Sequence, residues 1–120
     1  MSQLTTGSSL VPSARLEGTT LVAAVTGEID LNNSPEMRNA LLDLVTRHHV
    51  RKLVLNLAKV PYMDSSAIAV LVELLRKIGK GGVVALTDLQ PRVKGLLEIA
   101  RLDTIFAIAK TEQEALASNK

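Results

Sequence analysis

Asp64, Ser65 and Ser66 are three adjacent polar residues between two apolar segments, and they offer the clearest chemistry in this chain. Residues 53–57, before them, have the pattern of a buried strand, and residues 65–78 have the apolar periodicity of a helix. A serine hydroxyl at a helix start can accept a phosphoryl group and act as a switch, or it can simply occupy a first turn that Asp64 caps. On residue types alone, both interpretations stay open.

A serine hydrolase would need a nucleophile elbow, G-x-S-x-G, and a histidine able to reach the serine. Neither Ser65 nor Ser66 has those flanking glycines, and both histidines, His48 and His49, fall at the carboxyl end of a predicted helix. There an imidazole opposes the helix dipole favourably, and adjacent histidines lack the i, i+4 spacing of a helical metal site. The sequence therefore predicts a protein that is not an enzyme and holds no metal.

Nucleotide-binding loops are missing as well. Neither G-x-G-x-x-G nor G-x-x-x-x-G-K-[ST] occurs, and the glycine cluster at residues 79–82 precedes a strand pattern, where it predicts a helix stop. A receiver domain would carry its acceptor aspartate at the end of the third parallel strand, but Asn56 and Leu57 occupy that place. We expect no cofactor and no receiver-type phosphorylation site.

Composition narrows the partners and the compartment. The 120 residues carry a formal charge of +2 without a five-residue basic run, and they include one Tyr, one Phe and no Trp, so nucleic acid is not an expected partner. No apolar run approaches the roughly 20 residues that a membrane span needs, so membrane insertion is not expected. The first residues lack a signal-peptide pattern, and cysteine is absent. We expect a cytoplasmic protein.

Strand and helix patterns alternate along the chain. Strands are expected at 10–16, 21–26, 53–57, 83–86 and 106–109, and helices at 34–48, 65–78, 91–100 and 111–116. Ser34 is the expected N-cap of the first helix, with Pro35 at its first position. The expected buried stripe of the second helix consists of Ile68, Leu71, Val72, Leu75 and Ile78. This alternation predicts one α/β domain with a mostly parallel sheet, spanning 10–116 between flexible ends at 1–9 and 117–120.

The chain from about residue 21 to 116 resembles the STAS domain family, in particular single-domain anti-sigma factor antagonists. The resemblance is carried by G-E-I-D-L at 27–31, L-V-L-N-L at 53–57 and Y-M-D-S-S-A at 62–67. It implies a STAS-type layered fold with a mixed, mostly parallel sheet of about five strands and about four helices. It also implies that Ser66 is phosphorylated, with Ser65 as the fallback. Ala67 stands where the family motif has Gly.

The same resemblance implies the partners. The unphosphorylated form would bind an anti-sigma factor that is also a serine kinase of the histidine-kinase-like ATPase type, and a PP2C-type phosphatase would reset the phosphorylated form. Asp30 could instead only end a strand, and Asn32 and Asn33 could be turn residues. The expected partner-binding residues are Asp30, Leu31, Asn32, Asn33, Met63, Asp64, Ser65, Ser66 and Ile68. The alternative is a constitutive STAS subunit of a lipid-transport ATPase or signalling scaffold, without serine phosphorylation.

Overall fold

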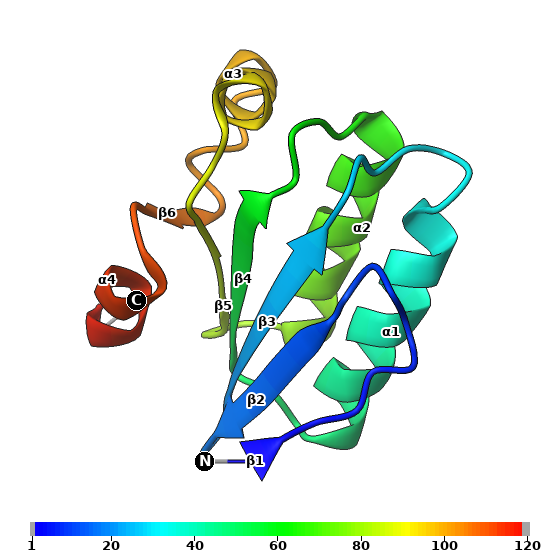
Figure 1. The fold of residues 1–120 in the computed structure, drawn as a ribbon. Helices are drawn as coiled ribbons and strands as arrows, with labels where there is room; N and C mark the ends of the chain where they lie inside the picture. Colours follow the sequence, from blue (N-terminus) through cyan, green and yellow to red (C-terminus); the bar gives the residue numbers. More distant parts are fainter. Residues whose placement is uncertain (1, 119–120) are drawn as a thin grey trace.

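The computed structural model describes residues 2–118, which form an α/β fold with a single mixed sheet (Figure 1). The strands lie in the sheet in the order of the chain: β1 (Ser2–Gln3), β2 (Ser13–Glu17), β3 (Thr20–Thr26), β4 (Lys52–Lys59), β5 (Val83–Thr87) and β6 (Ala107–Ala109). The pairs β1–β2 and β2–β3 are antiparallel, and the pairs from β3 to β6 are parallel. The helices are α1 (Ser34–Arg47), α2 (Ser65–Ile78), α3 (Pro91–Ile99) and α4 (Glu112–Ala117). The predicted fold class is confirmed.

The main core lies between the sheet and the pair α1 and α2, which cover one face of it. Strand residues alternate, so Leu53, Leu55 and Leu57 of β4 point into this core and are almost completely buried. From the helices, Met37, Leu41 and Leu44 of α1 and Leu71 and Leu74 of α2 fill it. Truncating one of these leucines to alanine should lower the free energy of unfolding by about 2–5 kcal/mol. The same packing fixes α1 and α2, and therefore their first turns, against the sheet.

Two helix details differ from expectation. α1 begins at Ser34 with Asn33 as its N-cap, one residue earlier than predicted, because the Ser34 N–H already donates to the Asp30 carbonyl oxygen at 2.8 Å. On α2 the fully buried residues are Ala67, Val70, Leu71, Leu74 and Ile78, whereas the predicted Ile68, Val72 and Leu75 are only partly buried. The helix packs against both the sheet and α1, so more than one side of it is apolar and the deepest stripe is rotated.

The amino-terminal segment, predicted to be a flexible end, makes several contacts from residue 2 onward. Strand β1 pairs with β2, the Leu4 N–H donates to the Ala14 carbonyl at 2.9 Å, and the Ser8 hydroxyl donates to the Glu36 carboxylate of α1 at 2.6 Å. Within residues 2–9, therefore, the chain continues the sheet and then crosses to α1. At the other end, α4 finishes at Ala117. The prediction of flexible ends also covers Met1 and residues 119–120, which lie outside the described residues.

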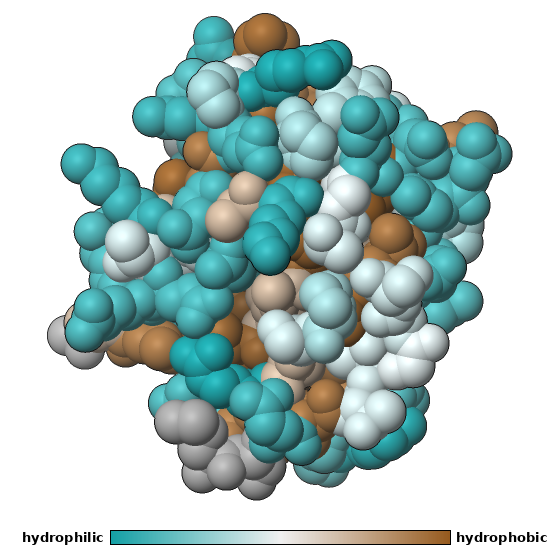
Figure 2. Space-filling model, in the orientation of Figure 1, coloured by the Kyte–Doolittle hydropathy of each residue, from teal (hydrophilic) through white to brown (hydrophobic). Residues whose placement is uncertain are grey.

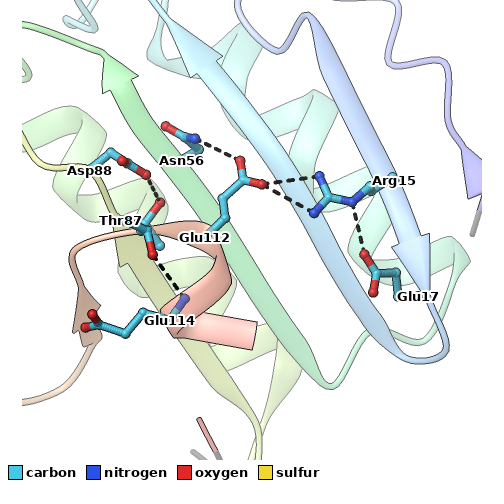
Figure 3. Close-up of polar contacts among 8 residues, drawn as sticks. Arg15, Glu17, Asn56, Thr87, Asp88, Glu112 and Glu114 are labelled. Atoms are coloured by element: carbon cyan, nitrogen blue, oxygen red, sulfur yellow. Dashed lines mark hydrogen bonds and ion pairs between the residues drawn. The ribbon is translucent and has the colours of Figure 1, made fainter. Parts of the chain in front are cut away.

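Helix α4 lies on the other face of the sheet, where polar contacts connect it to several strands (Figure 3). One Glu112 carboxylate oxygen accepts from both terminal guanidinium nitrogens of Arg15 on β2 at 3.3 Å, and the other accepts from Asn56 Nδ2 on β4 at 2.8 Å. Lys52 Nζ donates to the Ala115 carbonyl oxygen at 2.6 Å. The apolar cluster on this side is small: Val22, Val54, Ala85 and Ala115 are buried, and Ala107, Ala109 and Leu116 pack against them.

Candidate functional site

Asp64 is the N-cap of α2. Its backbone is extended, with φ −104° and ψ −173°, and its Oδ1 accepts from the backbone N–H groups of Ser66 at 2.9 Å and Ala67 at 3.4 Å. Both groups belong to the first turn of α2; the Ala67 N–H also donates to the Asp64 backbone carbonyl at 3.1 Å, whereas the Ser66 N–H depends on the side-chain cap. The predicted capping role of Asp64 therefore fits the geometry, and it fixes where the two serines stand.

The two serines differ in environment although they are neighbours. The Ser66 hydroxyl donates to Asp64 Oδ1 with 2.5 Å between the oxygens, and the residue is half-buried. Ser65 is exposed. The hydrogen bond directs the Ser66 proton towards Asp64, so the hydroxyl lone pairs face away from that carboxylate. Ser66 is thus an oriented hydroxyl at the edge of the surface.

The loop before α1 is held by its own side chains. Asp30 Oδ1 accepts from the backbone N–H of Asn32 at 2.9 Å, and Asn33 Oδ1 accepts from the Asp30 N–H at 2.8 Å. The Asn33 amide also donates to the Glu28 carbonyl at 2.8 Å. Asp30 and Asn33 therefore have structural roles as turn residues, which leaves Leu31 and Asn32, the two residues between them, as the side chains free to contact a partner.

This loop and the start of α2 form one continuous surface. The Leu31 N–H donates to Asp64 Oδ2 at 3.1 Å, the Ile29 N–H donates to the Tyr62 carbonyl at 3.0 Å, and Ile29 forms a parallel bridge with Met63. Both segments follow parallel strands, β3 and β4, so they emerge at the same end of the sheet (Figure 1). The structure thus brings together the two segments from which the expected partner contacts were drawn.

Exposure divides the predicted contact residues into three groups. Leu31, with 74% of its surface exposed, stands out from the loop as a large apolar side chain, and Asn32 and Ser65 are exposed as well. Asp30, Asn33, Asp64, Ser66 and Ile68 are half-buried. Met63, also predicted to contact the partner, is only 2% exposed and packs into the main core, so its side chain is not part of the exposed surface. Its position directly before the cap makes it a support for the loop.

The charge state of Asp64 follows from its partners. The Ser66 hydroxyl, followed by the backbone N–H groups of Ser66, Ala67 and Leu31, lowers the pKa of this carboxyl, and desolvation opposes them only in part. Asp64 is therefore an anion at neutral pH. A lowered pKa also makes it a poor proton acceptor, so it orients the Ser66 hydroxyl rather than activating it.

The sequence analysis missed a ring contact beside this surface. The guanidinium carbon of Arg92, on α3, lies 4.7 Å from the centroid of the Tyr62 ring. These residues are 30 positions apart, and no local pattern signals such a pair. The contact places a cation next to the segment that leads into Asp64.

The described residues show no site for a metal. Between residues 2 and 118, no three His, Asp or Glu side chains are close enough together to hold an ion. In the same part of the chain, no helix is both long and apolar enough to cross a membrane. What the site offers chemically is an oriented hydroxyl, a carboxylate and an exposed leucine on a rigid frame.

Known proteins resemble this one in sequence and in fold. A 32% identical relative, the anti-sigma F factor antagonist of Paenibacillus polymyxa, matches over 97 residues, which is 80% of this chain and 83% of that protein. An anti-sigma factor antagonist from Mycobacterium paratuberculosis has a similar structure, with a TM-score of 0.78, 24% identity and coverage of 86% and 87% of the two chains. The phosphorylated form of the Bacillus cell fate determinant SpoIIAA is also similar, with a TM-score of 0.66, 21% identity and coverage of 86% and 94%.

The family itself is defined by a model that spans nearly all of the described chain. The STAS domain model matches residues 12–115, from the start of β2 into α4, and so includes both segments of the site. The predicted family is confirmed: this protein belongs to the STAS domain family.

Proposed function

We propose that this protein is an anti-sigma factor antagonist whose binding to its anti-sigma factor is switched by phosphorylation of Ser66. One observation carries the proposal: the Ser66 hydroxyl is fixed by Asp64, and the same carboxylate fixes the loop that exposes Leu31. A modification at Ser66 thus occurs within the surface that would bind the partner. The 32% identical relative, named an anti-sigma F factor antagonist, supports the same role.

The proposed partner is an anti-sigma factor that is also a serine kinase of the histidine-kinase-like ATPase type. In its unmodified form the antagonist occupies this partner through the Leu31 loop and the start of α2, which frees the sigma factor. The kinase transfers the γ-phosphoryl group of ATP to Ser66 Oγ; the bond from the γ-phosphorus to the β-phosphate breaks, and the hydroxyl proton passes to a base outside this chain. A PP2C-type phosphatase hydrolyses the phosphoserine. The protein acts as ligand and substrate in the cytoplasm and catalyses nothing itself.

Two opposing effects decide what the phosphate does to the domain. The amino end of a helix favours a negative charge by about 0.3–2 kcal/mol, whereas a dianion near Asp64 repels it by about 1–4 kcal/mol at intermediate dielectric. Phosphorylation also removes the O–H donor that Asp64 accepts. These effects largely offset each other within a total stability of roughly 5–15 kcal/mol, so the fold should persist. The phosphorylated SpoIIAA structure, which shares this fold, supports that expectation.

At the interface nothing offsets the phosphate. A group carrying about −1.5 to −2 charges, stripped of water against a surface that fits the unmodified serine, costs several kcal/mol, and each 1.4 kcal/mol is about tenfold in affinity. Release of the partner therefore outweighs the local effects on α2.

The first test is phosphorylation by each histidine-kinase-like ATPase of the source genome, with ATP and mass spectrometry of the product. We expect one phosphate on wild type and on Ser65→Ala, the matched control, and none on Ser66→Ala. A phosphate that persists in Ser66→Ala would overturn the assignment.

A second test separates binding from folding. Ser66→Asp should weaken binding to the same kinase at least tenfold, while the thermal unfolding midpoint stays close to that of wild type. If no ATPase adds a phosphate and Ser66→Asp binds its partner like wild type, the protein is instead a constitutive subunit of a transport ATPase or scaffold.

A further inference from the structure

The side chain of Arg92 lies against an aromatic ring and has no anionic partner among the described residues. Its guanidinium lies over the face of Tyr62, 4.7 Å from the ring centroid, and its side chain remains exposed. Among the hydrogen bonds and ion pairs of residues 2–118, none involves the Arg92 side chain. A ring contact of this kind fixes the direction of a long side chain and leaves its N–H groups free to donate.

Helix stability does not explain this placement. Arg92 is the second residue of α3, whose first turn contains no acidic side chain, and a cation at the amino end of a helix opposes the dipole. Other contacts already anchor the start of this helix: Gln90 Nε2 donates to the Ala58 carbonyl at 2.7 Å, and Val93 is buried. The arginine is thus dispensable for the position of α3.

The Tyr62–Arg92 pair continues the surface described above. Tyr62 stands two residues before Asp64, and its carbonyl oxygen accepts from Ile29, directly before the Asp30 loop. In Figure 1, α3 lies at the end of the sheet where β3 and β4 run into these loops. The two segments of that surface carry the carboxylates of Glu28, Asp30 and Asp64, so Arg92 adds the opposite charge at its margin.

We propose that Arg92, held by Tyr62, extends the partner-binding surface onto α3 and binds a carboxylate of the anti-sigma factor. This inference rests on the proposed function. The partner should therefore present an acidic side chain towards Arg92, at the margin of the surface that contains Ser66. Because the ring already restricts Arg92, the side chain loses little freedom when it binds.

Figure 2 shows a mainly hydrophilic face interrupted by small hydrophobic areas. On a mainly polar surface, charge pairs affect the association rate and the orientation of a partner more than its affinity.

The test compares Arg92→Glu with Lys94→Glu, using the anti-sigma factor kinase and isothermal titration at several NaCl concentrations. Lys94 is also exposed on α3, but it lies about 200° around the helix from Arg92, so it makes a matched charge reversal. We expect Arg92→Glu to raise the Kd about tenfold at low salt and to flatten its salt dependence, and Lys94→Glu to leave both near wild type. Tyr62→Phe should preserve binding, and Tyr62→Ala should weaken it.

The outcomes separate the two proposals. If wild type binds and Ser66→Asp releases the partner, but Arg92→Glu and Lys94→Glu behave alike, the Arg92 contact is overturned and the switch stands. If wild type binds no anti-sigma factor, both are overturned. Circular dichroism melts exclude misfolding, and a folded Arg92→Lys variant with intermediate affinity provides the second measurement if Arg92→Glu unfolds.

Discussion

The backbone N–H of Leu31 donates to Asp64 Oδ2 at 3.1 Å and joins two loops that are 33 residues apart in the chain. The other oxygen of the same carboxylate caps α2 and accepts the Ser66 hydroxyl. One side chain therefore sets the helix start, the serine rotamer and the position of the exposed leucine. This arrangement makes several effects separable by mutation.

Replacing Asp64 separates its role as a helix cap from the roles of its charge and its second oxygen. Asp64→Ala should lower the free energy of unfolding by about 1–2 kcal/mol, because it removes the cap and the Leu31 contact. Asp64→Asn should cost less, because an asparagine oxygen is an equally good cap. Urea unfolding monitored by circular dichroism measures both. Equal losses for the two variants would show that the cap alone does not stabilise this site and that the charge or the second oxygen is required.

Acid should weaken the domain through carboxylates with lowered pKa values. Asp64 has its pKa lowered by the Ser66 hydroxyl, and Glu73 has its pKa lowered by the paired guanidinium of Arg38. For such groups the unfolded state binds more protons, so the stabilisation is complete above the ordinary pKa, near pH 4 to 4.5, and is lost as the pH falls through the folded value. Unfolding free energies between pH 3 and 7 should show this slope. In the double variant Asp64→Asn/Glu73→Gln, the unfolding free energy should depend less steeply on pH.

Leu31 should affect binding without affecting stability. Its side chain is 74% exposed, so Leu31→Ala should change the unfolding free energy by less than about 0.5 kcal/mol. At a partner interface the same truncation should cost about 1–2 kcal/mol, or roughly 5- to 30-fold in Kd. Ile99→Ala is the matched control, because Ile99 is 85% exposed at the other end of α3 from Arg92. A Leu31→Ala variant that binds like wild type would remove this loop from the interface.

Glu112 should control the attachment of α4. In Glu112→Ala, Arg15 and Asn56 lose their shared acceptor, and α4 and β6 should exchange amide hydrogens faster by a factor equivalent to about 1–2 kcal/mol. Gln113→Ala, an exposed neighbour in the same helical turn, should leave the exchange unchanged. Native-state exchange followed by NMR resolves the difference. Similar exchange in both variants would mean that the apolar contacts of Ala115 suffice.

The sequence predicts the elements well because their signals are local. The strand at 53–57 is a nearly continuous apolar run, the helix at 65–78 has helical periodicity, and Asp64 precedes α2 as a standard cap. The rotated stripe of α2 could not be predicted, since Ala67 and Val70 become buried only through the position of α1 and the sheet. Likewise β1 has two residues and depends on pairing with β2.

The candidate site likewise contains local contacts, which the sequence predicts, and long-range contacts, which it does not. The Asp64–Ser66 contact spans two residues and follows from the helix start, whereas the Leu31–Asp64 and Tyr62–Arg92 contacts cross from one strand–helix unit to another. The burial of Met63 has the same origin, because its bridge with Ile29 closes the space between two strand ends. Sequence periodicity contains no information on such junctions.

The sheet order has a consequence for synthesis. Every strand pairs with its neighbour in the chain, so no strand must wait for a distant later one before it can join the sheet. Once α2 has left the ribosome, β1 to β4 and both helices of the main core are available, and the Leu31 loop can close on Asp64. The segment from β5 to α4 then completes the domain, with Arg92 as the last addition to the surface.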